Sequence, residues 1–351
     1  MEQQVPWLLR APTLSARLLN SQQISLDQSD VPNLRFCYRC PALETLHIGT
    51  ATPSRDHELQ TLVDTDTLIH YMGQPSMRTM ILWDMHVVLY DDRSHSKYPP
   101  IEELNSLGRL SSLELRQVNI NADALVKLFC TCTDLRAFTL TRPSSNRGAL
   151  LLDELANVLR NVSSSLTSLT LGYHSVHKSP EITLLPSLRN MKALLHLKID
   201  PSMYLGRHLC PYRLPNHPVV VTRPASSFAD LLPDGLQTLT LDIDIEQVMR
   251  LPDYRRDIIT SIINARAHLP NLAEITLFED EAAWATATSL YSCGQCYRQG
   301  RIWRGNPGKR SVGEAQERRE FVKQMRRTEV KLFRDIGDGA GRYECTAWGS
   351  A

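Results

Sequence analysis

Residues 110–120 read LSSLELRQVNI, and this stretch decides the fold. Leu110, Leu113 and Leu115 form the pattern L-x-x-L-x-L, in which the leucines stand three and then two residues apart. Alternate side chains of a β-strand point to the same face, so Leu113 and Leu115 are expected to point inward together. One copy is compatible with any strand. Recurrence of the spacing would indicate a repeat architecture.

The pattern recurs in eight copies when a large aliphatic residue or Phe is allowed at each of its three anchor positions. Successive copies start 34, 33, 25, 31, 28, 42 and 36 residues apart, so the array is irregular and contains insertions. A weaker ninth copy at Leu14–Leu19 has Arg17 at its second anchor. The eight copies are Leu43-Leu46-Ile48, Met77-Met80-Leu82, Leu110-Leu113-Leu115, Leu135-Phe138-Leu140, Leu166-Leu169-Leu171, Leu194-Leu197-Ile199, Leu236-Leu239-Leu241 and Leu272-Ile275-Leu277.

Between the copies the apolar residues follow a helical period. This holds for Asn121–Cys132, Leu152–Val162 and Asp253–Leu269, where apolar side chains recur mostly at i, i+3, i+4 and i+7. Strand, helix and return to a parallel strand predict the α/β fold class. The expected architecture is a horseshoe solenoid with a parallel concave sheet, outer helices and irregular repeats.

A doubly wound α/β domain is the alternative, since it also alternates strands and helices. Its strands are buried on both faces and form continuous apolar runs. In this chain the residues between the anchors are polar, as at Thr45 and His47 or Ser112 and Glu114. One strand face is therefore expected to contact water, which favours the solenoid.

The solenoid is predicted to occupy residues 1–290, with a long surface loop over 201–230 that contains five prolines. Residues 291–351 are predicted to form a basic C-terminal segment with a helix at about 312–336. Arg298–Arg334 holds 12 Lys or Arg against 4 Glu. We interpret the helix as a cover for the end of the solenoid. A tail that binds an acidic partner or nucleic acid, or a disordered tail, stays open as an alternative.

The runs CPALETLHIG, LLPDGLQTLTLDI and HLPNLAEITLFED, separated by inserts of uneven length, resemble the leucine-rich-repeat proteins of filamentous fungi, many of which carry an N-terminal F-box. The resemblance covers roughly Pro12–Glu279. It implies a substrate-holding repeat array whose F-box recruits a ubiquitin-ligase scaffold. The residues before Leu43 contain no Leu-Pro-acidic helix opening, so a ligase scaffold is expected as a partner only if an F-box is missing from this chain. A truncated or degenerate gene product without a partner is the competing interpretation.

Composition excludes several classes of partner and location. The formal charge is +1, from 39 basic and 38 acidic side chains, so the whole protein has no field that would attract nucleic acid or anionic lipid. Arg10 and Arg17 interrupt the apolar residues near the N-terminus, which argues against a secretory signal. The chain also lacks an apolar run of about 18 residues. We expect an intracellular protein, in the cytoplasm or nucleus, with reduced cysteines.

Candidate chemistry is sparse. The C-x-x-C pairs Cys37/Cys40 and Cys293/Cys296 are too far apart in sequence for a structural zinc site. The pair His174/His177 lacks a third ligand at a recognisable spacing. The sequence contains no phosphate-binding, dinucleotide-binding, nucleophile-elbow or zinc-protease motif. No enzymatic activity, metal or cofactor is therefore expected.

The sequence predicts a protein-binding scaffold, because extended curved surfaces suit macromolecular partners. The strand phase places its candidate partner-binding residues on the concave face. They are His47, Trp83, Glu114, Arg116, Lys198, Asp242 and Phe278.

Overall fold

The computed structural model describes residues 23–26, 42–49, 61–83, 85–89, 109–141, 150, 152–172, 184–205, 223–243, 252–280, 316, 320–321, 323–325, 327, 329–335 and 343–344. The chain forms two compact units, Met1–Thr170 and Leu171–Ala351, which are described separately. The predicted division after residue 290 is a different boundary and stays a prediction.

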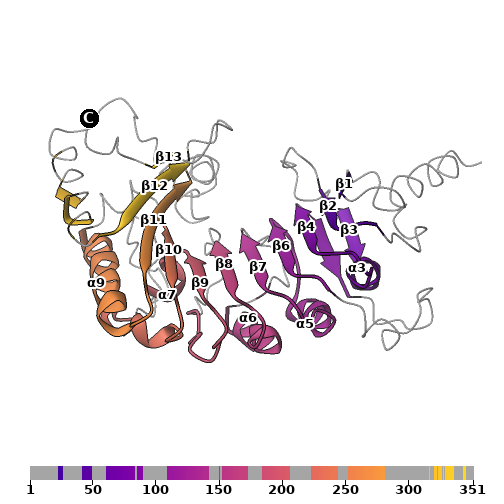
Figure 1. Cartoon of the computed structure of the whole chain (residues 1–351), viewed down its shortest axis with the longest axis horizontal. Coiled ribbons are helices and arrows are strands. Elements are labelled where there is room, and N and C mark those ends of the chain that lie inside the picture. Colours follow the sequence, from indigo (N-terminus) through magenta and orange to yellow (C-terminus); the bar gives the residue numbers. More distant parts are fainter. Residues whose placement is uncertain are drawn as a thin grey trace, which may run out of the picture. The chain divides into compact units, whose positions relative to one another are not determined.

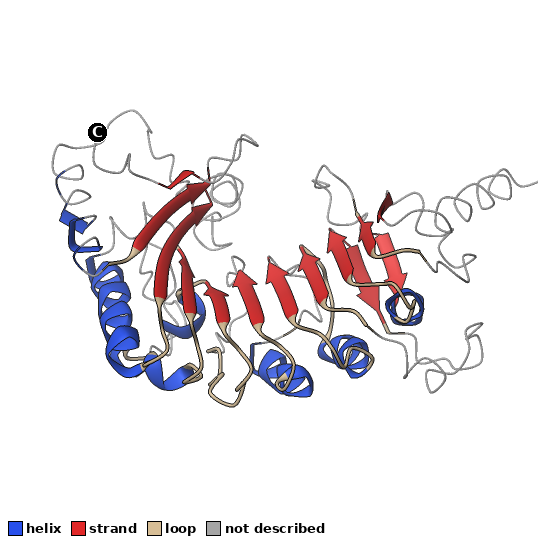
Figure 2. Ribbon diagram, in the orientation of Figure 1, coloured by secondary structure: helices blue, strands red, loops and turns tan. Residues whose placement is uncertain are grey.

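The first unit is built on parallel strands in the order β1 (Gln23–Leu26), β2 (Thr45–Ile48), β4 (Thr79–Trp83), β6 (Ser112–Arg116) and β7 (Ala137–Thr141). β8 (Ser168–Gly172) begins in this unit and ends in the second. β3 (Thr61–Asp64) pairs separately with β5 (Met85–Val88). Helices α3 (Thr65–Met72), α5 (Ala122–Cys130) and α6 (Leu152–Leu159), followed by the 3-10 turn η5 (Arg160–Val162), lie on one side of the main strands (Figures 1 and 2).

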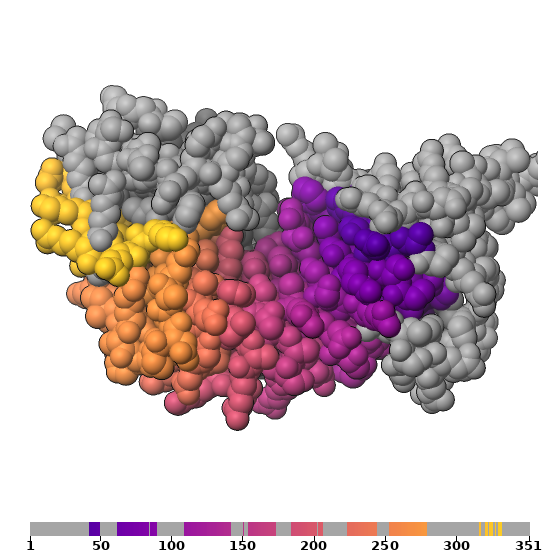
Figure 3. Space-filling view, viewed as in Figure 1, coloured from indigo at the N-terminus to yellow at the C-terminus, as the bar shows by residue number. Residues whose placement is uncertain are grey.

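The second unit continues the strand–helix alternation. β9 (His196–Ile199), β10 (Thr238–Asp242), β11 (Glu274–Asp280) and β12 (Lys331–Asp335) pair in parallel, and β13 (Tyr343–Glu344) pairs antiparallel with β12. Its helical segments are α7 (Ser202–Leu205), the 3-10 turns η6 (Ala225–Ser227) and η7 (Ala229–Leu231), and α9 (Pro252–His268). In the space-filling view side chains close the gap between strands and α9 that the ribbon leaves open (Figure 3).

Each of the eight predicted strands is present, and its anchors form the core. Almost all anchor side chains have an exposed fraction of 2% or less, and the highest value is 9% at Leu272. Aligned registers bring equivalent anchors together, as where Leu46 pairs with Met80 and Met80 with Leu113. Most residues between the anchors are half-exposed or exposed, as in the alternation of β4 and β7, whereas Thr276 of β11 is buried. A mixed α/β fold with a parallel sheet is therefore confirmed.

The carbonyl of the residue after the first anchor holds neighbouring turns together, and we call this residue the ladder position. The Glu44 carbonyl accepts the N–H groups of Arg78 and Thr79 at 2.8 and 3.0 Å. The Arg78 carbonyl accepts those of Ser111 and Ser112, both at 2.9 Å. The same double acceptance recurs at the ladder positions Ser111, Arg136, Leu195 and Gln237. Each strand therefore enters its sheet at a fixed register.

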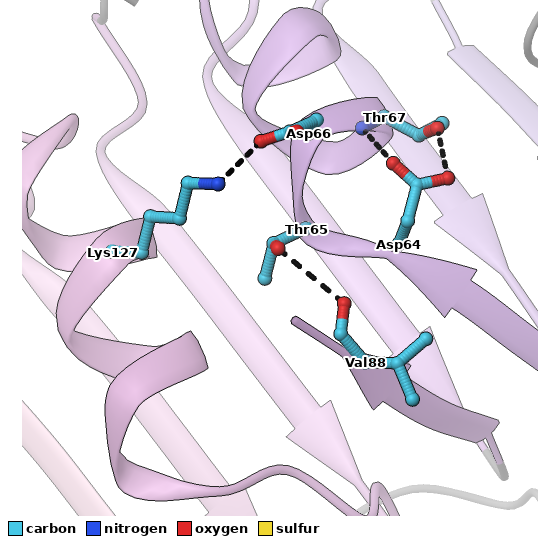
Figure 4. Close-up of polar contacts among 6 residues, drawn as sticks. All are labelled: Asp64, Thr65, Asp66, Thr67, Val88 and Lys127. Carbon is cyan, nitrogen blue, oxygen red and sulfur yellow. Dashed lines mark hydrogen bonds and ion pairs between the residues drawn. The ribbon is translucent and has the colours of Figure 1, made fainter. Parts of the chain in front are cut away.

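Helix α3 begins on a side-chain cap. Asp64 is extended (φ −81°, ψ 148°) and accepts from the backbone N–H and the hydroxyl of Thr67, each at 2.7 Å (Figure 4). This satisfies a donor that the first helical turn would otherwise leave without a partner. The Lys127 ammonium lies 2.6 Å from the Asp66 carboxylate and links α5 to α3. The anchor pattern did not predict β3, α3 or β5.

The predicted helices over Asn121–Cys132, Leu152–Val162 and Asp253–Leu269 are present as α5, as α6 with η5, and as α9. Cys132 follows α5 with an exposed fraction of 1%, so it packs in the core. Burial raises the pKa of its thiol to about 12, so Cys132 stays protonated at neutral pH. Its sulfur is a packing atom and not a reactive thiolate.

The predicted helix at 312–336 is wrong in its C-terminal part. Residues 331–335 form strand β12, which pairs with β11 so that Thr276 lies opposite Lys331. The helical residues end before Glu329, whose φ of 56° is left-handed. The Val330 N–H donates to the Met325 carbonyl at 3.1 Å, which is the bond pattern of a Schellman helix end. The apolar period misled the prediction because Leu332 and Phe333 belong to the strand.

The predicted surface loop over 201–230 is wrong at both ends, which form short helical segments. The rings of Tyr204 and Phe228 stack with centroids 3.9 Å apart, and both side chains are 1% exposed. Pro201 and Pro224 precede α7 and η6, where a missing N–H costs no helical hydrogen bond. The prediction gave all the prolines the same weight and ignored these two apolar aromatic residues.

Several predictions fall outside the described residues. These are the weak copy at Leu14–Leu19, the pairs Cys37/Cys40, His174/His177 and Cys293/Cys296, and most of the basic stretch Arg298–Arg334.

Substitutions on the two strand faces should change the free energy of unfolding by very different amounts. Leu113→Ala removes a fully buried side chain from β6 and should lower the free energy of unfolding by about 2–5 kcal/mol. Thr139→Ala, on the half-exposed face of β7, should change it by less than about 1 kcal/mol. Urea unfolding followed by circular dichroism measures both. Equal losses would contradict the assignment of the two faces.

Candidate functional site

The predicted site residues of the first unit come together on the half-exposed face of β2, β4 and β6. Register places His47 opposite Ile81, and Ile81 opposite Glu114, so neighbouring strands present these side chains side by side. The rings of His47 and Trp83 stack with centroids 6.5 Å apart and an interplanar angle of 19°. We call His47, Trp83, Glu114 and Arg116 the aromatic–arginine cluster.

Arg116 covers one side of Trp83. Its guanidinium carbon lies 5.7 Å from the centre of the indole ring, within the range of a cation–π contact worth about 0.5–1 kcal/mol at an exposed site. Its Nε also donates to the Glu114 carboxylate. The Arg116 side chain is 47% exposed and that of Glu114 is 20% exposed. The cluster thus presents an aromatic surface beside a guanidinium that is accessible to a partner.

Two residues that sequence reasoning missed hold Trp83 in place. The indole N–H donates to the side-chain oxygen of Gln117 at 3.3 Å. Gly49 follows β2 with φ 150°, and a Cβ built on it would lie 2.5 Å from the Trp83 carbonyl oxygen. The close approach of the two backbones therefore needs glycine. The glycine directly after the anchors Leu46 and Ile48 was a usable sequence signal, because glycine in or beside a strand often marks a close backbone approach.

The pKa of His47 is lowered from its ordinary value. Partial burial is the largest cause, because it disfavours the imidazolium, and the Arg116 charge acts in the same direction. The Glu114 carboxylate acts in the opposite direction. His47 is therefore neutral at physiological pH and adds no positive charge to the cluster.

The remaining three predicted residues lie together in the second unit. The Lys198 ammonium is 3.6 Å from the centre of the Phe278 ring and 3.5 Å from the Asp242 carboxylate. The Asp242 side chain is only 7% exposed, so it restrains Lys198 and offers a partner little surface. The seven predicted residues thus form two groups of neighbours, each within one unit.

Lys331 and Glu274 form a further contact in the second unit. The Lys331 ammonium lies 2.8 Å from the Glu274 carboxylate and ties β12 to β11. This hydrogen bond is the main reason that the pKa of Glu274 is lowered. Within the described segments no cluster of three or more His, Cys, Asp or Glu is arranged to hold a metal ion. No helix in those segments is long and apolar enough to cross a bilayer.

Replacement of Gly49 should disturb Trp83 and the stability of the first unit. In Gly49→Ala the new methyl group would meet the backbone and Cβ of Trp83 below 3.0 Å, so we expect a loss of about 1–3 kcal/mol in the free energy of unfolding. Gly235→Ala is the matched control, because its nearest contact would be an ordinary 3.5 Å. Thermal unfolding and near-ultraviolet circular dichroism compare the two. An unchanged Gly49→Ala variant would contradict the close approach.

The His47 titration tests the electrostatics of the cluster. NMR should give His47 a midpoint below 6.5. Arg116→Gln removes a neighbouring positive charge and should raise the pKa of His47, whereas Glu114→Gln removes a negative charge and should lower it further. Shifts in the same direction for both variants would contradict the arrangement.

Comparison with known proteins shows little similarity. No protein-family model and no curated protein matches the chain. Solved structures match the chain, and among them is one titled "Crystal structure of TLR13-ssRNA13 complex", with 14% sequence identity and a TM-score of 0.26. The similarity covers 76% of this chain and 43% of that one, so the chain spans less than half of the length of that protein.

Proposed function

We propose that this chain is an irregular leucine-rich-repeat solenoid that acts as a non-catalytic scaffold and binds a partner protein on its half-exposed strand face. The repeat architecture is supported by the buried anchors, the aligned registers and the double hydrogen bond at successive ladder positions. Each strand–helix unit has apolar faces that it cannot bury alone, so stacking on its neighbours is required.

The aromatic–arginine cluster is the observation that carries the binding function. Trp and Arg are enriched among the residues that dominate the energetics of protein interfaces. Trp83 is half-buried and is fixed by Gln117, Arg116 and the close approach of Gly49. Because the Trp83 side chain is already restrained, little of its conformational entropy is lost when a partner covers it.

The resemblance to fungal F-box-associated proteins suggests a narrower form of the same function, in which the repeats hold a substrate for a ubiquitin ligase. This narrower function requires an intracellular location, which we propose together with it. Capture of ligase-scaffold subunits together with the tagged chain would support the narrower form, and their absence among the captured proteins would leave the general scaffold.

Site-specific photo-crosslinking tests the proposed face. Benzoylphenylalanine at Thr139, on the half-exposed face of β7, should crosslink a partner in cell extract. The matched position Asp123 lies exposed on α5 and should give less product. Trp83→Ala combined with Arg116→Ala should reduce the Thr139 crosslink at least about tenfold, since interface hot spots are worth about 2 kcal/mol or more each. Equal crosslinking from both positions, or no effect of the double variant, would overturn the placement.

A further inference from the structure

Three arginines lie at the amino-terminal edge of the strands in the first unit. Arg78 and Arg136 occupy ladder positions, and Arg109 directly precedes the first anchor of the copy between them. Register makes β4, β6 and β7 neighbours in that order, so three successive turns each carry one arginine. Arg109 and Arg136 are exposed and Arg78 is half-buried. We call these three residues the arginine edge.

The charges of this edge lie close together without a counterion from the described residues. Arg78 donates Nη1 to the carbonyls of Met77 and Arg109, at 3.2 and 3.5 Å, which holds its guanidinium beside the backbone of the next turn. No ion pair within the described segments involves Arg78, Arg109 or Arg136. An anion bound there would relieve the repulsion between neighbouring guanidinium groups.

The fold does not require arginine at the ladder positions Arg78 and Arg136, because the ladder bond uses the backbone carbonyl and not the side chain. The equivalent residues of the second unit are Leu195 and Gln237, and Ala273 follows the first anchor of the next copy. These are uncharged, yet Leu195 and Gln237 accept the same pair of hydrogen bonds. The guanidinium groups of Arg109 and Arg136 are exposed, and that of Arg78 has further N–H donors besides the Nη1 that bonds the two carbonyls.

We propose that the arginine edge binds an acidic, extended segment of the partner protein, an inference that rests on the proposed scaffold function and specifies its partner. Neighbouring strands lie about 4.8 Å apart, so Arg78 and Arg136 are separated by about 10 Å along the sheet. Carboxylates at alternate positions of an extended peptide point to the same side and lie about 7 Å apart, so three of them span about 13 Å, a distance that the long arginine side chains can match. Arg109 lies on the turn between them and meets the residues in between.

The flanking charges favour a peptide over a nucleic acid. Exposed carboxylates stand at Glu44, the preceding ladder position, and at Asp134, directly before the first anchor of β7. A continuous phosphate backbone that follows the edge would meet both negative charges. A peptide of mixed sequence can place basic or neutral residues opposite Glu44 and Asp134 and acidic residues opposite the arginines.

Fluorescence anisotropy with a defined probe tests this inference. The probe is a labelled Gly/Ser peptide of about 12 residues with a central Asp-Ser-Asp-Ser-Asp sequence, whose three carboxylates point to one side of the extended chain and which is long enough to cross the edge. The full chain should bind it, and the affinity should fall steeply between about 50 and 200 mM salt. The Asp→Asn version of the peptide should bind at least about tenfold more weakly.

The combined variant R78Q/R109Q/R136Q removes three positive charges and should lose at least about tenfold in affinity for the probe. The fold should tolerate Gln at the ladder positions, because Gln237 already occupies one. The control R189Q/K192Q/R256Q removes the same charge from exposed positions of the second unit and should bind like the native chain. If Arg78→Gln impairs folding in circular dichroism, R109Q/R136Q alone should still weaken binding several-fold.

If both triple variants lose the same affinity for the peptide, binding depends only on net charge, and the proposal is overturned. Tighter binding of a polythymidine oligonucleotide than of the acidic peptide would overturn it in favour of nucleic acid. Full peptide affinity of the arginine variant, together with a Thr139 crosslink that depends on Trp83, would refute this inference while the scaffold function stands. Peptide binding without that crosslink would refute the scaffold placement and leave the arginine edge.

Discussion

The double hydrogen bond at the ladder position is the constraint on which the structure depends. One carbonyl directly after the first anchor accepts two successive N–H groups of the next turn, for example Glu44 from Arg78 and Thr79. The bond sets the register of the strand that follows, and the register decides which side chains are buried. The segment between two copies can then vary in length without displacing a strand. Copy spacings of 25 to 42 residues are compatible with one pattern of pairing for this reason.

The two strand faces contribute differently to the structure, and only one of them is open to the partner that we propose. The anchor face loses apolar surface to the core, and its residues are almost fully buried. The other face holds side chains that contact one another across strands, such as His47 on Trp83 and Lys198 on Phe278. These contacts add modest energies, but they restrict rotamers and so present a defined surface. Surface rigidity and core burial thus come from alternate residues of the same short strands.

The strands were predictable from the sequence because the anchors alone determine them. Leu113 and Leu115 are buried as the spacing requires, and the residues that the strand phase selected form two groups of neighbours, one in each unit. Strand β12 escaped the search because the pattern requires an aliphatic residue or Phe three residues before Val330 and five before Leu332, and Arg327 stands there. A left-handed Glu329 ended the preceding helix, and nothing in its residue type announces a positive φ. The contact between Gly49 and Trp83 was hidden for another reason, since it joins different strands.

At the ladder position the side chain can change in evolution faster than the backbone architecture. Its carbonyl is common to every residue type, and the described copies place Glu, Arg, Ser, Leu and Gln there with the same backbone bonds. A change of residue type at this position therefore leaves the carbonyl that makes the ladder bond in place. Selection can rewrite the electrostatic pattern along the edge while the scaffold persists, so duplicated descendants of such a chain can acquire new binding preferences long before their architecture diverges.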